Sequence, residues 1–118
     1  MDAIYGSQGD VVGWLEDEEI VRDLSGQVVG WLYGDAVYGL SGQHAGYFNN
    51  GNFRDDRGTV VAFVAGAQGG PAKPARHARP ARPARAARPA RPARAARRTR
   101  AARAFAWSDL SFSQYLRR

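Results

Sequence analysis

Apolar residues in the first 67 positions recur with a period of sixteen to seventeen residues. Gly9, Gly26, Gly42 and Gly58 lie 17, 16 and 16 residues apart. After each glycine come a polar residue, two mostly β-branched residues, a small residue, an aromatic residue and an aliphatic or aromatic one. The aromatic positions are Trp14, Trp31, Tyr47 and Phe63. Val and aromatic residues are enriched in β-strands. The periodicity therefore predicts four copies of one β-rich unit.

Each unit has the pattern of a β-hairpin. A short apolar strand precedes each turn and contains, in register, Ile4, Val21, Val37 and Phe53. Glycine at the end of the turn supplies the positive φ that tight hairpin turns require. Because one hairpin is not stable alone in water, we expect an all-β fold. It consists of four tandem β-hairpins, about eight short antiparallel strands, arranged around a pseudo-four-fold axis so that no strand edge stays exposed.

The two faces of each second strand are both apolar. Since side chains alternate along a strand, we expect Val12 and Trp14 on one face, and Gly13 and Leu15 on the other. Closing the ring turns one face inward. The glycine face would then be covered by another element, such as the tail or a second subunit.

A finer alternation distinguishes odd units from even ones. Four equivalent positions read Tyr5, Arg22, Tyr38 and Arg54. This pattern predicts a pseudo-two-fold within the four-fold, with cation–π contacts worth about 0.5–1 kcal/mol when exposed. Two interpretations remain open at this point: these side chains are rim residues of the less buried strand, or they line an axial binding surface.

Charge and composition divide the 118 residues into three segments. The acidic hairpin repeat occupies residues 1–67, a Gly/Pro/Ala/Arg linker of low complexity occupies 68–104, and an apolar C-terminal docking motif occupies 105–118. The net charge of +6 hides this division, because ten of the eleven carboxylates precede residue 71 whereas fourteen of the seventeen basic residues follow it. Such asymmetry is typical of an appended interaction tail.

The linker consists of triplets that end in a basic residue, from "PAK" at 71–73 to "AAR" at 101–103. Proline favours an extended or disordered tail with polyproline II character, in which a period of three places the arginines on one edge. Three interpretations stay open: a solvated spacer, weak capture of the protein's own acidic head, or salt-dependent, non-specific binding of a polyanion. The residues predicted for polyanion binding are Arg76, Arg79, Arg82, Arg85, Arg88, Arg91, Arg94, Arg97, Arg98, Arg100 and Arg103.

The C-terminal segment "WSDLSFSQYLRR" predicts a short helix. Ser111 and Gln114 have the spacing of a capping box. An apolar motif after a polar tail is expected to bury itself, either on the glycine face of the repeat or in a groove of another protein. The docking residues are Trp107, Leu110, Phe112, Tyr115 and Leu116.

Residues for catalysis or metal binding are scarce. The chain has no cysteine, and its two histidines, His44 and His77, lie in different regions. No nucleophile–base pattern and no P-loop occur. The adjacent carboxylates at 16–19 lack the spacing of a calcium loop. We therefore expect no enzyme, no cofactor and no metal. Since no signal peptide or apolar run of about 18 residues is visible, we also expect a cytoplasmic protein without a transmembrane segment.

The motifs "GQVVGWL", "GQHAGYF" and "GTVVAFV", followed by a Pro-rich segment and "WSDLSFSQYL", resemble the four-fold β-flower proteins. In these small bacterial proteins, hairpin repeats form petals around a central axis. The resemblance covers about residues 4–67 and the terminal segment, and it implies a fold and architecture but no activity and no catalytic residue.

Two functions from different classes follow as hypotheses. The first is a non-enzymatic protein-interaction or structural module of uncharacterised role, which binds an unknown protein partner or itself. The alternative is a non-specific binder of nucleic acid or anionic membrane that acts through the arginine-rich tail.

Overall fold

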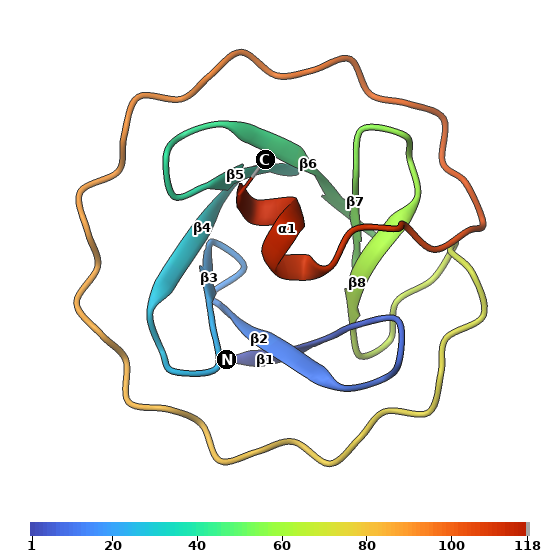
Figure 1. The fold of residues 1–118 in the computed structure, drawn as a ribbon, viewed down its shortest axis with the longest axis horizontal. Coiled ribbons are helices and arrows are strands. Elements are labelled where there is room, and N and C mark those ends of the chain that lie inside the picture. Colours follow the sequence, from blue (N-terminus) through green and yellow to red (C-terminus); the bar gives the residue numbers. More distant parts are fainter. Residues whose placement is uncertain (118) are drawn as a thin grey trace.

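The computed structural model describes residues 1–117, so only the last residue of the 105–118 segment lies outside it. Eight antiparallel strands form a closed barrel in which each strand pairs with the next and β1 pairs with β8 (Figure 1). This architecture confirms the predicted all-β fold of four hairpins. The strands are β1 (Asp2–Tyr5), β2 (Val11–Glu16), β3 (Ile20–Arg22), β4 (Val28–Tyr33), β5 (Ala36–Gly39), β6 (His44–Asn49), β7 (Asn52–Arg54) and β8 (Val60–Val64).

All four hairpins share the same irregularity. In the first hairpin Ile4 pairs with Gly13 but Tyr5 pairs with Val11, so that Val12 is an extra, bulged residue. The same register shift recurs in the other three hairpins. A bulge places two residues of one strand opposite one residue of its partner and strengthens the local twist. The four bulged residues are Val12, Val29, Ala45 and Val61.

The bulge overturns the predicted assignment of strand faces. Val12 packs against the axial core, together with Leu15, whereas Val11 packs outward with Trp14. The extra residue reverses the alternation, so Val12 and Trp14 do not share a face. The glycine face is the inward one. The buried axial core consists of Ile4, Leu15, Val21, Leu32, Val37, Ala45, Phe53, Val61, Ala62, Phe112, Tyr115 and Leu116.

The repeated aromatic residues lie on the outer side of the barrel. Trp14, Trp31, Tyr47 and Phe63 occupy equivalent strand positions and belong to three separate outer clusters. They are at most 9% exposed. A barrel of eight short strands leaves such side chains in water unless another element covers them, and here the tail passes over this side (Figure 1).

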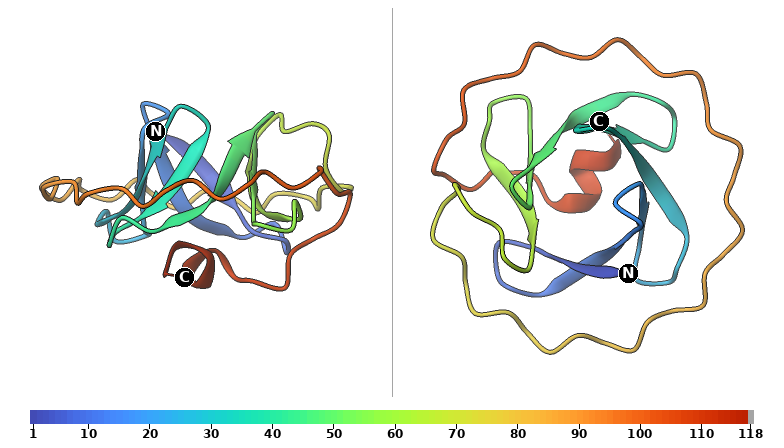
Figure 2. Two further views of the ribbon diagram at one scale, coloured as in Figure 1. Left: turned by 90° about the horizontal axis from the view of Figure 1, so that it is seen from above. Right: turned by 180° about the vertical axis from the view of Figure 1, so that it is seen from behind.

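One end of the barrel is closed by the short helix α1 (Phe112–Arg117), which lies across the axis (Figures 1 and 2). Ser111 and Gln114 form the predicted capping box, each accepting the other's backbone N–H through its side chain. The barrel glycines make room for this helix. A Cβ at Gly30 would lie 3.2 Å from Leu116, and one at Gly46 would lie 2.6 Å from the hydroxyl of Tyr115.

The tail is extended and runs once around the outside of the barrel before it descends to α1 (Figures 1 and 2). We call residues 74–104 the belt. The molecule is a flat disc of 35 × 35 × 21 Å. Within residues 1–117, no helix has the length and apolar character that crossing a bilayer requires.

Candidate functional site: the belt and the outer face of the barrel

The belt is attached to the barrel at four equivalent points, which we call stations. At each station one belt N–H donates to the carbonyl of a turn glycine, at distances of 2.9 to 3.2 Å. The donors lie nine residues apart along the belt, whereas the acceptors are the four glycines that anchor the hairpin repeat. The pairs are His77 with Gly9, Ala86 with Gly26, Ala95 with Gly42, and Ala104 with Gly58.

The nine-residue step fits the size of the barrel. Polyproline II has three residues per turn and rises 3.1 Å per residue, so nine residues make three turns and span about 28 Å. One such step for each quarter of the ring makes about 110 Å, which is about the perimeter of a circle as wide as the 35 Å disc. The belt makes three of these steps between its first station and its last. The belt thus presents the same edge to each hairpin in turn.

The distribution of proline follows from these hydrogen bonds. Proline has no backbone N–H and cannot donate at a station. Prolines open triplets at 74, 80, 83, 89 and 92, whereas residues 77, 86, 95 and 104 are histidine or alanine. The station residues were not predicted from the sequence. Up to residue 95 the signal that marks them is the missing proline in every third triplet, whereas the triplets at 98 and 101 lack proline as well, so that the station at Ala104 has no such signal.

The turn glycines are required by the close approach of the belt. At Gly26 the backbone has φ +91°, and an added Cβ would lie 2.1 Å from the carbonyl oxygen of Ala84. The other three anchoring glycines have the same surroundings, with belt carbonyls at 2.0 to 2.2 Å from the Cβ position. A side chain there would both strain the turn and push the belt away.

A second hydrogen bond completes three of the stations. Arg22 Nη1 donates to the carbonyl of Ala86 at 2.9 Å, Arg54 Nη1 to that of Ala104 at 2.8 Å, and the Tyr38 hydroxyl to that of Ala95 at 3.3 Å. At the first station the guanidinium of Arg76 lies 5.8 Å from the ring centre of Tyr5. The structure therefore places the alternating set Tyr5, Arg22, Tyr38 and Arg54 on the outer face, buried under the belt and away from the barrel axis.

A buried carboxylate holds the second station. Glu16 is 2% exposed, and its carboxylate accepts hydrogen bonds from Arg22 at 2.8 Å and from belt residues Arg85 at 2.5 Å and Arg88 at 3.3 Å. The hydrogen bond from Arg22, reinforced by Arg85, lowers the pKa of Glu16 to about 2, although burial opposes this shift. Charge-assisted bonds of this kind are stronger than neutral ones.

Further along the belt, arginines pair with more exposed groups. Arg91 pairs with Glu19, Arg97 and Arg100 pair with Asp35, and Arg98 pairs with Asp56. Exposed pairs contribute about 0–1 kcal/mol each. Aromatic rings add to them, because Arg94 lies 3.8 Å from the ring centre of Tyr33 and Arg100 lies 4.3 Å from that of Tyr47. Most of the arginines predicted to bind polyanions thus contact the barrel. Of the eleven arginines in that prediction, all within the described residues, five form no ion pair: Arg76, Arg79, Arg82, Arg94 and Arg103.

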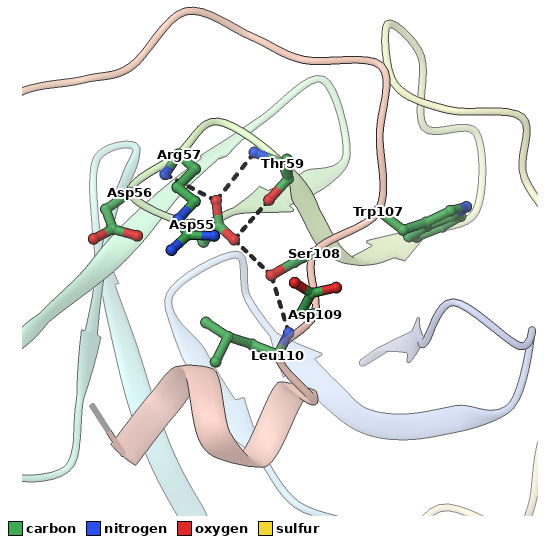
Figure 3. A pocket seen from close by; sticks show the side chains of 8 residues that line it. All are labelled: Asp55, Asp56, Arg57, Thr59, Trp107, Ser108, Asp109 and Leu110. Atoms are coloured by element: carbon green, nitrogen blue, oxygen red, sulfur yellow. Dashed lines mark hydrogen bonds between the residues drawn. The ribbon is translucent and has the colours of Figure 1, made fainter.

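The segment after the belt lines a polar pocket of about 330 Å³ beside the β7–β8 turn (Figure 3). Asp55 occupies its wall, and its carboxylate accepts hydrogen bonds from the backbone of Arg57 and Thr59 and from the hydroxyls of Thr59 and Ser108. The carboxylate therefore serves to hold the turn and the descending chain together. Within residues 1–117, no group of three or more potential ligands gathers to bind a metal ion.

The residues of the predicted docking motif lie on the chain's own barrel. Phe112, Tyr115 and Leu116 enter the axial core, and Leu110 packs beside them. Trp107 lies outside, with its ring 6.0 Å from that of Phe63. The hydroxyl of Tyr115 donates to the carbonyl of Arg54 at 2.9 Å.

These features define a class of protein: a closed barrel of four equivalent hairpins, plugged by a C-terminal helix. A family model described as "4-fold beta flower protein" matches residues 2–116, and the chain belongs to this family. A search of the curated proteins and a search of the solved structures found no match.

Proposed function

We propose that this protein is a non-enzymatic interaction and structural module, in which a rigid barrel holds its arginine-rich tail in place and presents it to a protein partner or to a second copy. The observation that best supports this proposal is the contact repeated every nine residues. A solvated spacer that does not contact the barrel would not require an N–H donor at each station or a glycine at each acceptor position. The tail is thus a built part of the surface.

The ionisable groups support a structural role over a catalytic one. Glu16, Arg22 and Asp55 are each buried and each hold a turn or the belt. His44 accepts the backbone N–H of Arg98 through Nδ1 at 3.0 Å. Catalytic acids and bases need access to a substrate. Glu16, Arg22 and His44 are engaged beneath the belt, whereas the carboxylate of Asp55 is occupied by hydrogen bonds from its own turn and from Ser108.

Polyanion binding remains the second candidate, because the belt arginines in ion pairs are still 33–60% exposed. A phosphate chain would have to compete with the barrel's carboxylates for the same guanidinium groups. We therefore expect weak binding that disappears near physiological salt.

Capture experiments with the full-length chain test the first candidate. Wild-type protein and an Ala86→Pro variant, which removes the donor of one station, are immobilised and exposed to an extract of the native host, and self-association is measured by analytical ultracentrifugation. We expect a partner or a dimer that the wild type binds and that the variant binds less. Equal retention by both proteins, or none by either, contradicts the proposal.

A duplex titration at about 50 and 150 mM salt tests the second candidate. The matched variant is Arg79→Gln with Arg82→Gln, since these two arginines form no ion pair with the barrel. Tight binding with a steep salt dependence, weakened in the variant, would favour the polyanion binder over the interaction module.

A further inference from the structure

Units two and four of the barrel place an arginine at the same position but give it different neighbours. Arg22 pairs across the strands with Trp14, and Arg54 pairs with Tyr47 in the same register. Two residues beyond Trp14 stands Glu16, whose carboxylate accepts from Arg22. Two residues beyond Tyr47 stands Asn49. The site around Arg54 therefore has a neutral amide where the site around Arg22 has a negatively charged carboxylate.

The belt has an arginine at the equivalent position of both units, although only the first unit has a carboxylate. Arg85 precedes the station residue Ala86 and binds Glu16. Arg103 precedes the station residue Ala104 and so stands at the corresponding place beside Arg54. Burial, followed by the charge of Arg103, lowers the pKa of Arg54. Arg103 thus adds a second positive charge to a unit that has Asn49 in place of the carboxylate of Glu16.

Two polar atoms at the site around Arg54 have no hydrogen-bond partner within residues 1–117. Arg22 Nε donates to Glu16 at 2.8 Å, whereas the buried Arg54 Nε and Asn49 Oδ1 have no partner among the described residues. Arg54 is only 3% exposed, and its Nη groups reach the neutral carbonyls of Gly58, Ala104 and Gly69.

A third positive charge lies close by. Burial, followed by the charge of Arg54, lowers the pKa of Lys73. The charge of the neighbouring Asp55 favours the charged form of Arg54, but no carboxylate among the described residues forms an ion pair with this guanidinium. A buried cation without a directly bonded counter-charge is costly, and a bound anion reduces that cost.

We propose that Arg54 and Arg103 bind one oxyanion group, a phosphate, sulfate or carboxylate, at the place that the Glu16 carboxylate occupies in the equivalent unit. Arg54 Nε is a free donor for one oxygen of such a group, and the guanidinium of Arg103 has the fork geometry that matches two oxygens. Rotation of the Asn49 amide by about 180° places its NH₂ where Oδ1 lies, so that the amide donates to an oxygen of the anion. Lys73 adds positive charge at longer range.

Calorimetric titration of the full-length protein with inorganic phosphate and with acetate, at constant ionic strength in chloride, tests the site. We expect one saturable binding event per chain and a rise in melting temperature. A response to phosphate alone assigns a tetrahedral anion, and a response to acetate assigns a carboxylate, as from a partner's side chain. No saturable response to either anion overturns the proposal.

Two substitutions locate the site. Asn49→Glu supplies the carboxylate internally, and we expect a higher melting temperature without phosphate and loss of the phosphate response. Arg103→Gln should weaken binding about tenfold or more, as expected for loss of a charge-assisted bond. Its matched control is Arg85→Gln, the equivalent residue beside Glu16, which should leave phosphate binding unchanged. The assignment is wrong if both arginine variants weaken phosphate binding equally, or if Asn49→Glu binds phosphate as the wild type does.

Discussion

At the scale of single residues, the belt depends on which positions keep a backbone N–H and which lack a Cβ. Ala86 donates to Gly26, and that glycine allows the carbonyl of Ala84 to approach. Alanine at a station has no side-chain chemistry of its own. Its role is to be neither proline nor bulky, which is why composition alone did not reveal it.

Ala86→Pro tests the role of the station N–H. The substitution removes one hydrogen bond and places a ring against the carbonyl of Gly26, so we expect the free energy of unfolding to fall by about 1 kcal/mol or more. Ala101→Pro is the matched control, since Ala101 also opens a triplet but donates to no backbone carbonyl among the described residues. Urea unfolding should show the control within about 0.5 kcal/mol of wild type. Equal loss in both variants would refute a specific role for the station.

The buried Glu16 gives the protein a defined response to acid. Its folded pKa of about 2 lies below the ordinary value of 4.5, so its ion pair contributes full stability above about pH 4.5 and loses it as the pH falls toward 2. We expect Glu16→Gln to lower the free energy of unfolding at pH 7 by about 1–3 kcal/mol.

The same variant should flatten the decline between pH 4.5 and 2. Urea unfolding across this range measures both effects. An unchanged acid profile in Glu16→Gln would show that other carboxylates govern it.

At the scale of elements, the sequence predicted the hairpins and the helix but not which face points inward. The glycine period, the turn residues and the Ser111–Gln114 capping box are local signals, and the structure confirms them. The bulge at Val12 has no such signal, because the extra residue is one of two adjacent valines and does not interrupt the apolar pattern. The alternation between odd and even units singled out Arg22. Its place under the belt depends on its hydrogen bond to Ala86, which is 64 residues away in the sequence.

The helix α1 stabilises the barrel as a plug. Tyr115 is fully buried, and we expect Tyr115→Ala to cost about 3–5 kcal/mol, as for other large-to-small changes of aromatic core residues. Tyr115→Phe removes only the hydrogen bond to the carbonyl of Arg54 and should cost about 1 kcal/mol.

The exposed Ser113 on the same helix is the control, and Ser113→Ala should change stability by less than about 0.5 kcal/mol. Chemical unfolding of the full-length variants measures these differences. If Tyr115→Ala is no more destabilising than Ser113→Ala, the helix is not a structural plug.

At the scale of the whole molecule, the barrel and the belt fit because their repeats match. Four hairpins present four glycine carbonyls, and a chain with three residues per turn reaches the next one after nine residues. The sequence shows both periods separately. The hairpin period and the three-residue period of the tail are related only through the closed ring, because its perimeter determines that one hairpin corresponds to nine residues of the belt.

Hydrogen exchange along the tail, followed residue by residue by NMR, tests whether the belt is bound to the barrel every nine residues. If the tail is bound at its four stations, the amides of His77, Ala86, Ala95 and Ala104 should exchange at least about tenfold more slowly than those of Ala84 and Ala93, whose N–H groups have no backbone acceptor among the described residues. Fast and uniform exchange from residue 74 to 104, without a nine-residue pattern, would contradict a tail that is bound to the barrel.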